Sequence, residues 1–163
     1  MAGASTPAIR TLTKAGVAHR VHSYKHDPRA ESFGTEAVDA LAADLGVEPE
    51  QIFKTLVLEL STGTLAVAVL PVPQTLSLKA AAAALGAPKA SMADRAKAER
   101  STGYVLGGIS PLGQRKALPT VIDESALRWD RVLCSAGRRG LEIELAPAEL
   151  VRLTEAVTAP VTA

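Results

Sequence analysis

Aromatic side chains are scarce in this chain of 163 residues, where they make up 3% of the sequence against 47% for all hydrophobic residues. Alanine is the commonest residue, so we expect a core of Leu, Val, Ile and Ala rather than of large rings. Each of the few aromatic positions therefore carries more information than usual.

Cysteine occurs once, at Cys134, which excludes a disulfide within the chain. The paired Cys and His spacing of a structural zinc site is missing too, so we expect neither a metal nor a cofactor. Residues 1–10 lack the apolar run of a signal peptide, and no apolar stretch approaches the length of a membrane span. We therefore expect a cytoplasmic protein with no membrane partner.

Net charge is also small, at +1, which is too little for strong nonspecific adhesion to nucleic acid by counterion release alone. DNA is accordingly not an expected partner, and any RNA binding must use local basic groups. Gln114-Arg115-Lys116 and Arg138-Arg139 are two such groups, and both could contact phosphate. Short charge clusters are more often ordinary solvated surface, so neither is a specific motif.

Helical and β-type patterns are interspersed without a repeat or a clear linker, which predicts one α+β domain over residues 1–163. Thr6-Pro7 is typical of a helix start, and Ser61-Thr62-Gly63 separates two β-rich runs that favour an antiparallel hairpin. We expect the edges of short strands to be closed into a barrel or covered by helices. The expected strands are 18–24, 53–60, 64–70, 104–106, 120–122, 132–135 and 141–145, with helices over 7–16, 35–45, 77–85, 92–100 and 147–156.

Lys54 is a lone cation between residues that otherwise read as a core strand. Its ordinary role would be that of an outward-facing strand lysine. Its functional role, in the alternative, would be to bind a phosphate, a ribose or a polarised carbonyl, because an ammonium group supplies several donors and one positive charge.

Residues 101–113 contain four glycines among apolar and hydroxyl residues. Such glycines either serve turn geometry or let the backbone approach a ligand closely. The segment resembles neither a Walker loop nor a dinucleotide fingerprint, which argues against nucleotide hydrolysis and hydride transfer.

Three histidines, His19, His22 and His26, are candidates for metal binding or acid-base chemistry. His19 and His22 would share a strand face only if no bulge or register change intervenes. Cys134 lies in an apolar run, where a buried structural thiol is commoner than a reactive one. No Cys-His or Ser-His-Asp arrangement follows from the order of residues.

Read together, several of these segments resemble the YbaK family, which is related to the editing domain inserted into bacterial prolyl-tRNA synthetases. The resemblance extends across almost the whole chain. The matching segments are Thr6-Pro7-Ala8, Tyr24-Lys25-His26-Asp27, Phe33-Gly34, Phe53-Lys54-Thr55-Leu56, Arg100-Ser101-Thr102-Gly103-Tyr104, residues 107–114, residues 118–123 and Gly137-Arg138-Arg139-Gly140.

The resemblance implies a YbaK-like α+β fold, with a mixed β-barrel-like sheet surrounded by helices and a pocket for the aminoacylated end of tRNA. It makes Lys54 the foremost functional candidate. Glu142 stands where the family commonly has Asp, and Ala136 where Gly is expected. The substrate-binding positions that it implies are Tyr24, Phe33, Thr55, Gly107, Ser135 and Glu142.

The activity implied by the resemblance is removal of cysteine from mischarged Cys-tRNA(Pro), and also from Cys-tRNA(Cys). In the family mechanism the substrate thiol attacks its own ester, releasing tRNA and a cyclic thiolactone, so the protein supplies no nucleophile. Lys54 would hold the terminal adenosine or its phosphate, and Gly107 would donate backbone contacts near the ester. Tyr24 and Phe33 would shape the amino-acid pocket, while Ser135 and Glu142 would hydrogen-bond the amino group, the ribose or each other.

Aminoacylated tRNA is thus the expected partner, with a transient prolyl-tRNA synthetase complex supplying selection among tRNA bodies. Two alternatives remain open. A related deacylase for alanine or another small amino acid would need water or a ribose hydroxyl as its nucleophile. A noncatalytic tRNA-binding or synthetase-associated module would keep the fold without turnover.

Overall fold

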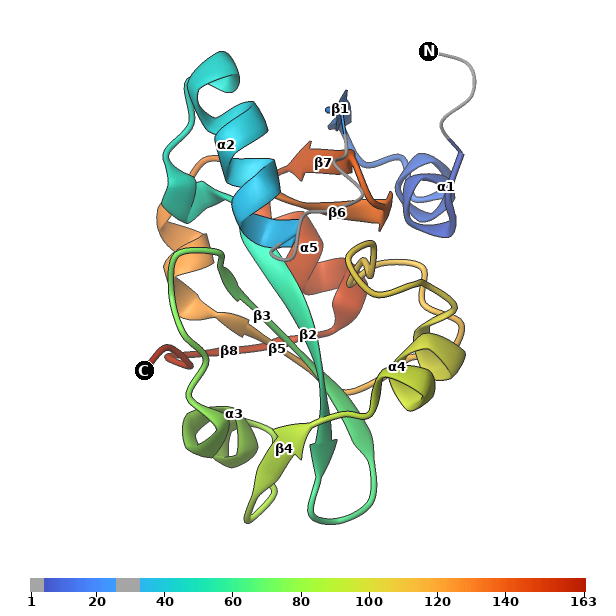
Figure 1. Cartoon of the computed structure of the whole chain (residues 1–163), viewed down its shortest axis with the longest axis vertical. Coiled ribbons are helices and arrows are strands. Elements are labelled where there is room, and N and C mark those ends of the chain that lie inside the picture. The colour runs from blue at the N-terminus through green and yellow to red at the C-terminus, as the bar shows by residue number, and fades with distance from the viewer. Residues whose placement is uncertain (1–4, 26–32) are drawn as a thin grey trace.

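The computed structural model describes residues 5–25 and 33–163, and it has helices arranged around two β-sheets (Figure 1). None of the helices among those residues is both long and apolar enough to cross a membrane. The helices are α1 (Pro7–Lys14), α2 (Phe33–Leu45), α3 (Leu78–Ala84), α4 (Arg95–Thr102) and α5 (Pro147–Thr154). The strands are β1 (His19–Ser23), β2 (Phe53–Leu60), β3 (Leu65–Pro71), β4 (Ala90–Met92), β5 (Thr120–Asp123), β6 (Val132–Arg138), β7 (Leu141–Leu145) and β8 (Val157–Ala159).

The larger sheet has five strands in the order β4-β2-β3-β5-β8. Strands β2 and β3 form the predicted antiparallel hairpin, with Lys54 opposite Leu70 and Thr55 opposite Val69. Strands β5 and β8 run parallel to their neighbours, so the sheet is mixed. In Figure 1 the β2–β3 hairpin is the longest feature and extends away from the smaller sheet.

The smaller sheet is antiparallel, in the order β1-β7-β6. A parallel bridge between Ile52 and Leu133 joins it to the start of β2, so the two sheets meet where Lys54 and Thr55 begin the hairpin. The mixed β core and the surrounding helices confirm the predicted α+β fold class.

Strand β7 has a buried residue at every position, including two carboxylates. Leu141, Ile143 and Leu145 belong to the main core, on one face of the smaller sheet. Because successive strand residues point to opposite faces, Glu142 and Glu144 lie on the other face. That face is covered by a second apolar cluster that includes Ala37, Leu41 and Ala42 of α2.

One predicted helix is shifted, and one predicted strand is wrong. The helix expected over 92–100 is present as α4, but it begins only at Arg95, where the Asp94 side chain accepts a hydrogen bond from the Lys97 amide, and Met92 instead ends β4 beside Leu58. The strand expected over 104–106 is a loop. Helix α4 ends at Gly103 with a φ of 80°, which turns the chain away from the sheet.

Candidate active site

A pocket of about 210 Å³ lies between the start of β2, helix α2, the smaller sheet and the loop 105–109. Most of its wall is apolar, and its polar groups come from different elements. Its lining residues are Tyr24, Ala37, Ile52, Phe53, Lys54, Thr55, Leu56, Val72, Leu106, Gly107, Ile109, Ser135 and Glu142.

Six of the seven predicted site residues line this pocket, although they are spread from position 24 to position 142. The seventh, Phe33, is the first residue of α2, and its side chain is outside the described part of the structure. The apolar wall formed by Ala37, Val72 and Ile109 was not predicted, because these residues read as ordinary core in the sequence.

Lys54 is half-buried at the β2 end of the pocket. Its Nζ donates a 2.7 Å hydrogen bond to the backbone oxygen of Gln74, in the segment that follows β3. Burial lowers the pKa of the Lys54 ammonium below its ordinary value. An ammonium has three N–H donors, so this single bond leaves donors for a ligand.

Thr55 places an unpaired polar atom in the pocket wall. Its Oγ1 is buried and has no hydrogen-bond partner among the residues that the structure describes. A buried hydroxyl without a partner costs about 1–3 kcal/mol, so it is uncommon without a reason. Its position in the pocket makes a bound ligand or water the natural partner.

Two buried carboxylates on the same face of β7 have opposite environments. Burial alone would raise the pKa of Glu144, but hydrogen bonds from His22 and Arg131 outweigh it and lower that pKa below its ordinary value. Glu142 has no such partner in the described part of the chain, and burial raises its pKa to about 8. The carboxyl group that faces the pocket is therefore mainly protonated at neutral pH, and it can donate as well as accept a hydrogen bond.

Tyr24 and Ser135 lie beside Glu142. Burial, together with the charges of Glu142 and Glu36, raises the pKa of the Tyr24 hydroxyl to about 12, so this phenol stays protonated. Ser135 is directly opposite Glu142 in the β6–β7 ladder, which puts both side chains on one face. Its Oγ accepts a 3.1 Å bond from the Gly137 amide, within an irregular stretch between Ser135 and Arg138.

Ala136 is fully buried, and its backbone oxygen accepts a hydrogen bond from the Thr6 hydroxyl. Its φ is not in the left-handed region, so its extra methyl group is compatible with the local backbone. Gly137, the next residue, has a φ of 104°, and a Cβ there would come within 2.6 Å of the Tyr104 ring. Glycine freedom is thus needed one position after Ala136.

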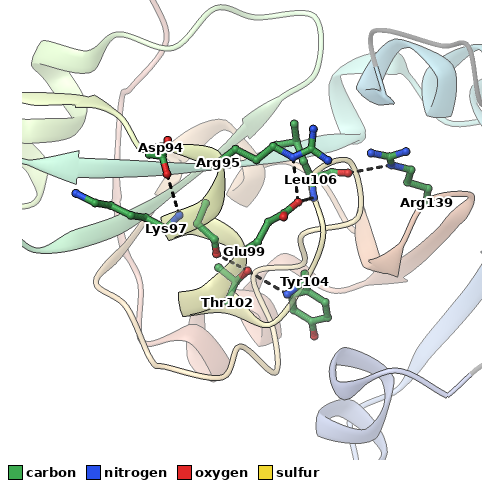
Figure 2. Close-up of polar contacts among 9 residues, drawn as sticks. Asp94, Arg95, Lys97, Glu99, Thr102, Tyr104, Leu106 and Arg139 are labelled. Atoms are coloured by element: carbon green, nitrogen blue, oxygen red, sulfur yellow. Dashed lines mark hydrogen bonds and ion pairs between the residues drawn. The ribbon is translucent and has the colours of Figure 1, made fainter.

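The loop 105–109 carries Gly107, which has a φ of 88°. Figure 2 shows the contacts that hold it. The Glu99 carboxylate accepts a 2.8 Å hydrogen bond from the Leu106 amide, and Arg139 Nε donates a 2.9 Å bond to the Leu106 carbonyl. Arg139 was predicted only as a phosphate contact or solvated surface, and Glu99 was not singled out.

His19 and His22 are not among the residues that line the pocket. His19 Nδ1 is 2.8 Å from the Val17 carbonyl oxygen, His22 contacts Glu144, and His26 is outside the described residues. The described residues contain no group of three or more His, Cys, Asp or Glu side chains that could hold a metal ion. Cys134 is buried on β6, where burial and the nearby Glu142 raise its pKa well above the ordinary value, so it is not a reactive thiolate.

Fold and pocket together define an α+β protein with a small, mostly apolar site, in which a lysine, a protonated acid and glycine backbone converge. The chain belongs to the aminoacyl-tRNA editing domain family, which it matches over residues 34–153. This match confirms the resemblance drawn from the sequence.

Individual relatives agree with this assignment. The chain is 40% identical over 144 residues to an Enterococcus faecalis protein named "Putative Cys-tRNA(Pro)/Cys-tRNA(Cys) deacylase EbsC", covering 88% of this chain and 87% of that protein. The solved structure of "a putative trans-editing enzyme for prolyl tRNA synthetase" is 27% identical with a TM-score of 0.82, over 99% of each chain. Hypothetical protein APE2540 is also 27% identical, with a TM-score of 0.82 over 97% of this chain and 100% of its own.

Proposed function

We propose that this protein is a deacylase that removes cysteine from Cys-tRNA(Pro) and from Cys-tRNA(Cys). The observation that carries the proposal is the convergence of Lys54, Thr55, Gly107 and Glu142 on one pocket, in a member of the aminoacyl-tRNA editing family. The relative that is 40% identical bears the name of this activity.

Pocket size supports a small amino acid as the group that enters. Sites for drug-sized ligands measure roughly 300–1,000 Å³. At about 210 Å³ the pocket has room for a small side chain and the ester, but not for a whole nucleotide as well. The terminal adenosine would therefore lie at the mouth, where Lys54 can donate to its ribose or its phosphate.

The reaction needs no nucleophile from the protein if the substrate is cysteinyl-tRNA. The cysteine sulfur attacks its own ester carbonyl, the bond from that carbon to the ribose oxygen breaks, and the thiol proton passes to the leaving ribose oxygen. The products are a thiolactone and free tRNA. The pocket supports this route by orientation, because its described lining includes neither a histidine to activate a hydroxyl nor a cysteine to attack the ester.

Each polar group then has a defined task. A Gly107 backbone amide can stabilise negative charge as it develops on the carbonyl oxygen. Protonated Glu142 can bind an acceptor without placing a negative charge beside that oxygen, and Thr55 Oγ1 gains the partner that it lacks in the described structure. Tyr24, a neutral phenol, closes the pocket beside Glu142.

The deciding experiment is release of amino acid from cysteinyl-, alanyl- and prolyl-tRNA by the wild-type protein, Lys54→Ala and Lys79→Ala. Lys79 is an exposed lysine of α3 and serves as the matched control. We expect release of cysteine alone, with a loss of 100-fold or more in kcat/KM for Lys54→Ala and none for Lys79→Ala, on the order of the loss of one catalytic donor. No turnover of any substrate would favour a noncatalytic RNA-binding module.

A thiol-free isostere, 2-aminobutyryl-tRNA, separates cyclisation from hydrolysis. Cyclisation requires the sulfur, so this substrate should be stable, and thiolactone should be trapped by an added amine from cysteinyl-tRNA. Release of 2-aminobutyrate or alanine at a comparable rate would instead identify a hydrolase that uses water or a ribose hydroxyl.

We also propose that a transient complex with prolyl-tRNA synthetase supplies selection among tRNA bodies. The net charge of +1 supports this, because it gives the isolated chain little long-range attraction for RNA. Pull-down from a mixture of purified synthetase and charged tRNA tests it, and lack of association at low and moderate salt would count against it.

A further inference from the structure

Leu106 is a pocket-lining loop residue whose two backbone polar groups are both held by charged side chains. Glu99 accepts from its amide at 2.8 Å, and Arg139 donates to its carbonyl at 2.9 Å. These side chains come from different elements, since Glu99 belongs to α4 and Arg139 lies in the turn between β6 and β7. Figure 2 shows them on either side of Leu106.

The Arg139 contact determines the direction of the next amide. The described residues contain no cis peptide bond, so the Leu106–Gly107 peptide is trans. In a planar trans peptide the carbonyl and the following N–H point in opposite directions. Holding the Leu106 carbonyl therefore aims the Gly107 N–H away from the Arg139 side chain. That N–H donates no hydrogen bond to any described residue, so it is free to bind a ligand.

Both holding groups are themselves supported. The Leu106 amide holds the pKa of Glu99 below its ordinary value, and Arg95 contributes through a 3.2 Å ion pair on the same helix. On the other side, a Cβ on Gly108 would come within 2.9 Å of the Arg138 Cα and the Arg139 amide nitrogen. The loop thus lies directly against the β6–β7 turn, which fixes its distance from Arg139.

We propose that Arg139 and Glu99 are positioning residues, which fix the Leu106–Gly107 peptide so that the Gly107 N–H is presented to the substrate carbonyl in the pocket. The inference rests on the proposed deacylase function. Arg139 acts through the hydrogen bond that its guanidinium donates to the Leu106 carbonyl rather than through an RNA phosphate, and Glu99 acts without touching substrate.

The test compares Arg139→Met, Arg139→Gln and Glu99→Ala with Arg138→Met, in steady-state turnover of cysteinyl-tRNA. Arg138 is the matched control, because it is an exposed arginine at the end of β6, next to Arg139, with no side-chain hydrogen bond or ion pair to the described residues. We expect kcat to fall about tenfold or more in Arg139→Met and Glu99→Ala with KM nearly unchanged, as for a partly misplaced oxyanion donor. Arg139→Gln keeps an N–H donor at the position of Nε and should recover part of the loss, and Arg138→Met should keep the wild-type kcat.

Amide hydrogen exchange at Leu106 and Gly108 provides a readout that is independent of turnover, because the Gly108 amide donates a 2.9 Å hydrogen bond to the Val105 carbonyl within the loop. Faster exchange at Leu106 is expected in Glu99→Ala, and at Gly108 in Arg139→Met, with thermal unfolding close to that of the wild type. Unchanged exchange in both variants would overturn the proposal whether or not the protein turns over its substrate.

The kinetic outcomes also separate the two proposals. A wild-type protein without turnover refutes the deacylase function. An active wild type whose kcat is unaffected by either substitution refutes the positioning role alone. A rise in KM with constant kcat in Arg139→Met would mean that Arg139 binds RNA phosphate, which also overturns the proposal.

Discussion

Glu142 and Glu144 are two residues apart on β7 and similarly buried, but within the described residues only Glu144 has cationic and hydrogen-bonding partners. Taking a carboxylate out of water disfavours its charged form unless donors replace the water. Glu144 gains those donors from His22 and Arg131, and it is a structural ion. Glu142 lacks them, remains protonated near neutral pH and faces the pocket.

This difference predicts a pH-dependent stability. The pKa of Glu142 rises from an ordinary 4.5 to about 8 on folding, so the folded chain keeps a proton that the unfolded chain releases. The free energy of unfolding should therefore fall as pH rises from about 5 to about 8, by up to about 1.4 kcal/mol per unit. The free energy of unfolding, measured by urea denaturation at several pH values in this range, should depend less on pH in Glu142→Gln than in the wild type. An equal dependence on pH in the two proteins would refute the assignment.

Thr55 gives a second prediction at a single residue. Its hydroxyl makes no hydrogen bond in the described structure, so Thr55→Val removes an unpaired buried polar group while keeping the shape. We expect unfolding free energy to stay level or to rise by about 1 kcal/mol. Deacylation should nevertheless fall, because the ligand loses its partner. A loss of stability with normal turnover would show that the hydroxyl serves the fold and not the site.

At the scale of elements, the loop 103–113 departs most from what the sequence predicts. Its apolar residues read as a strand, but the positive φ of Gly103 ends α4 in a turn, and the Tyr104 hydroxyl donates to the Leu112 carbonyl at 2.7 Å. Leu106 then bonds to two side chains instead of to a neighbouring strand. Secondary-structure propensity does not predict these contacts, because their partners are distant in the sequence.

Close packing of this loop predicts unequal effects of two glycine substitutions. Gly108→Ala would place a Cβ within 2.9 Å of the β6–β7 turn, and it should cost about 1–3 kcal/mol and displace Gly107, lowering kcat. A Cβ on Gly16 would have no atom within 4 Å, so the only cost of Gly16→Ala is the positive φ of 69°. We expect a loss of about 1 kcal/mol of stability, with kcat unchanged. Thermal unfolding and turnover measured on both variants decide the point, and equal kcat in the two would count against a role for loop placement.

Over the whole molecule, charge is distributed more unevenly than its net value indicates. Residues 100–118 contain Arg100, Arg115 and Lys116 and no acidic residue. Arg100 lies in the last turn of α4, and hydrogen bonds from the amides of Arg115 and Lys116 to the carbonyls of Thr102 and Ser101 hold the other two cations against the end of that helix. This arrangement favours phosphate contact by the segment.

The salt concentration should therefore affect the binding of cysteinyl-tRNA more than the rate of the deacylation step. Arg115→Gln combined with Lys116→Gln should raise KM for cysteinyl-tRNA and lessen its salt dependence, with a log–log slope lower by about 1–2. Turnover of a 3′-cysteinyl adenosine ester, which lacks the acceptor stem, should be unchanged. Equal salt dependence in both proteins would assign these cations to ordinary solvated surface.

The sequence by itself determined the helix caps, the β2–β3 hairpin and the family, because these depend on local patterns and on short motifs. Thr6 and Ser77 cap their helices as such patterns require. Only the tertiary structure decided which carboxylate stays protonated, which hydroxyl lacks a partner and how the Gly107 loop is held. Those properties depend on desolvation and on contacts between distant segments, such as Glu99 and Arg139 meeting at Leu106, which no local pattern records.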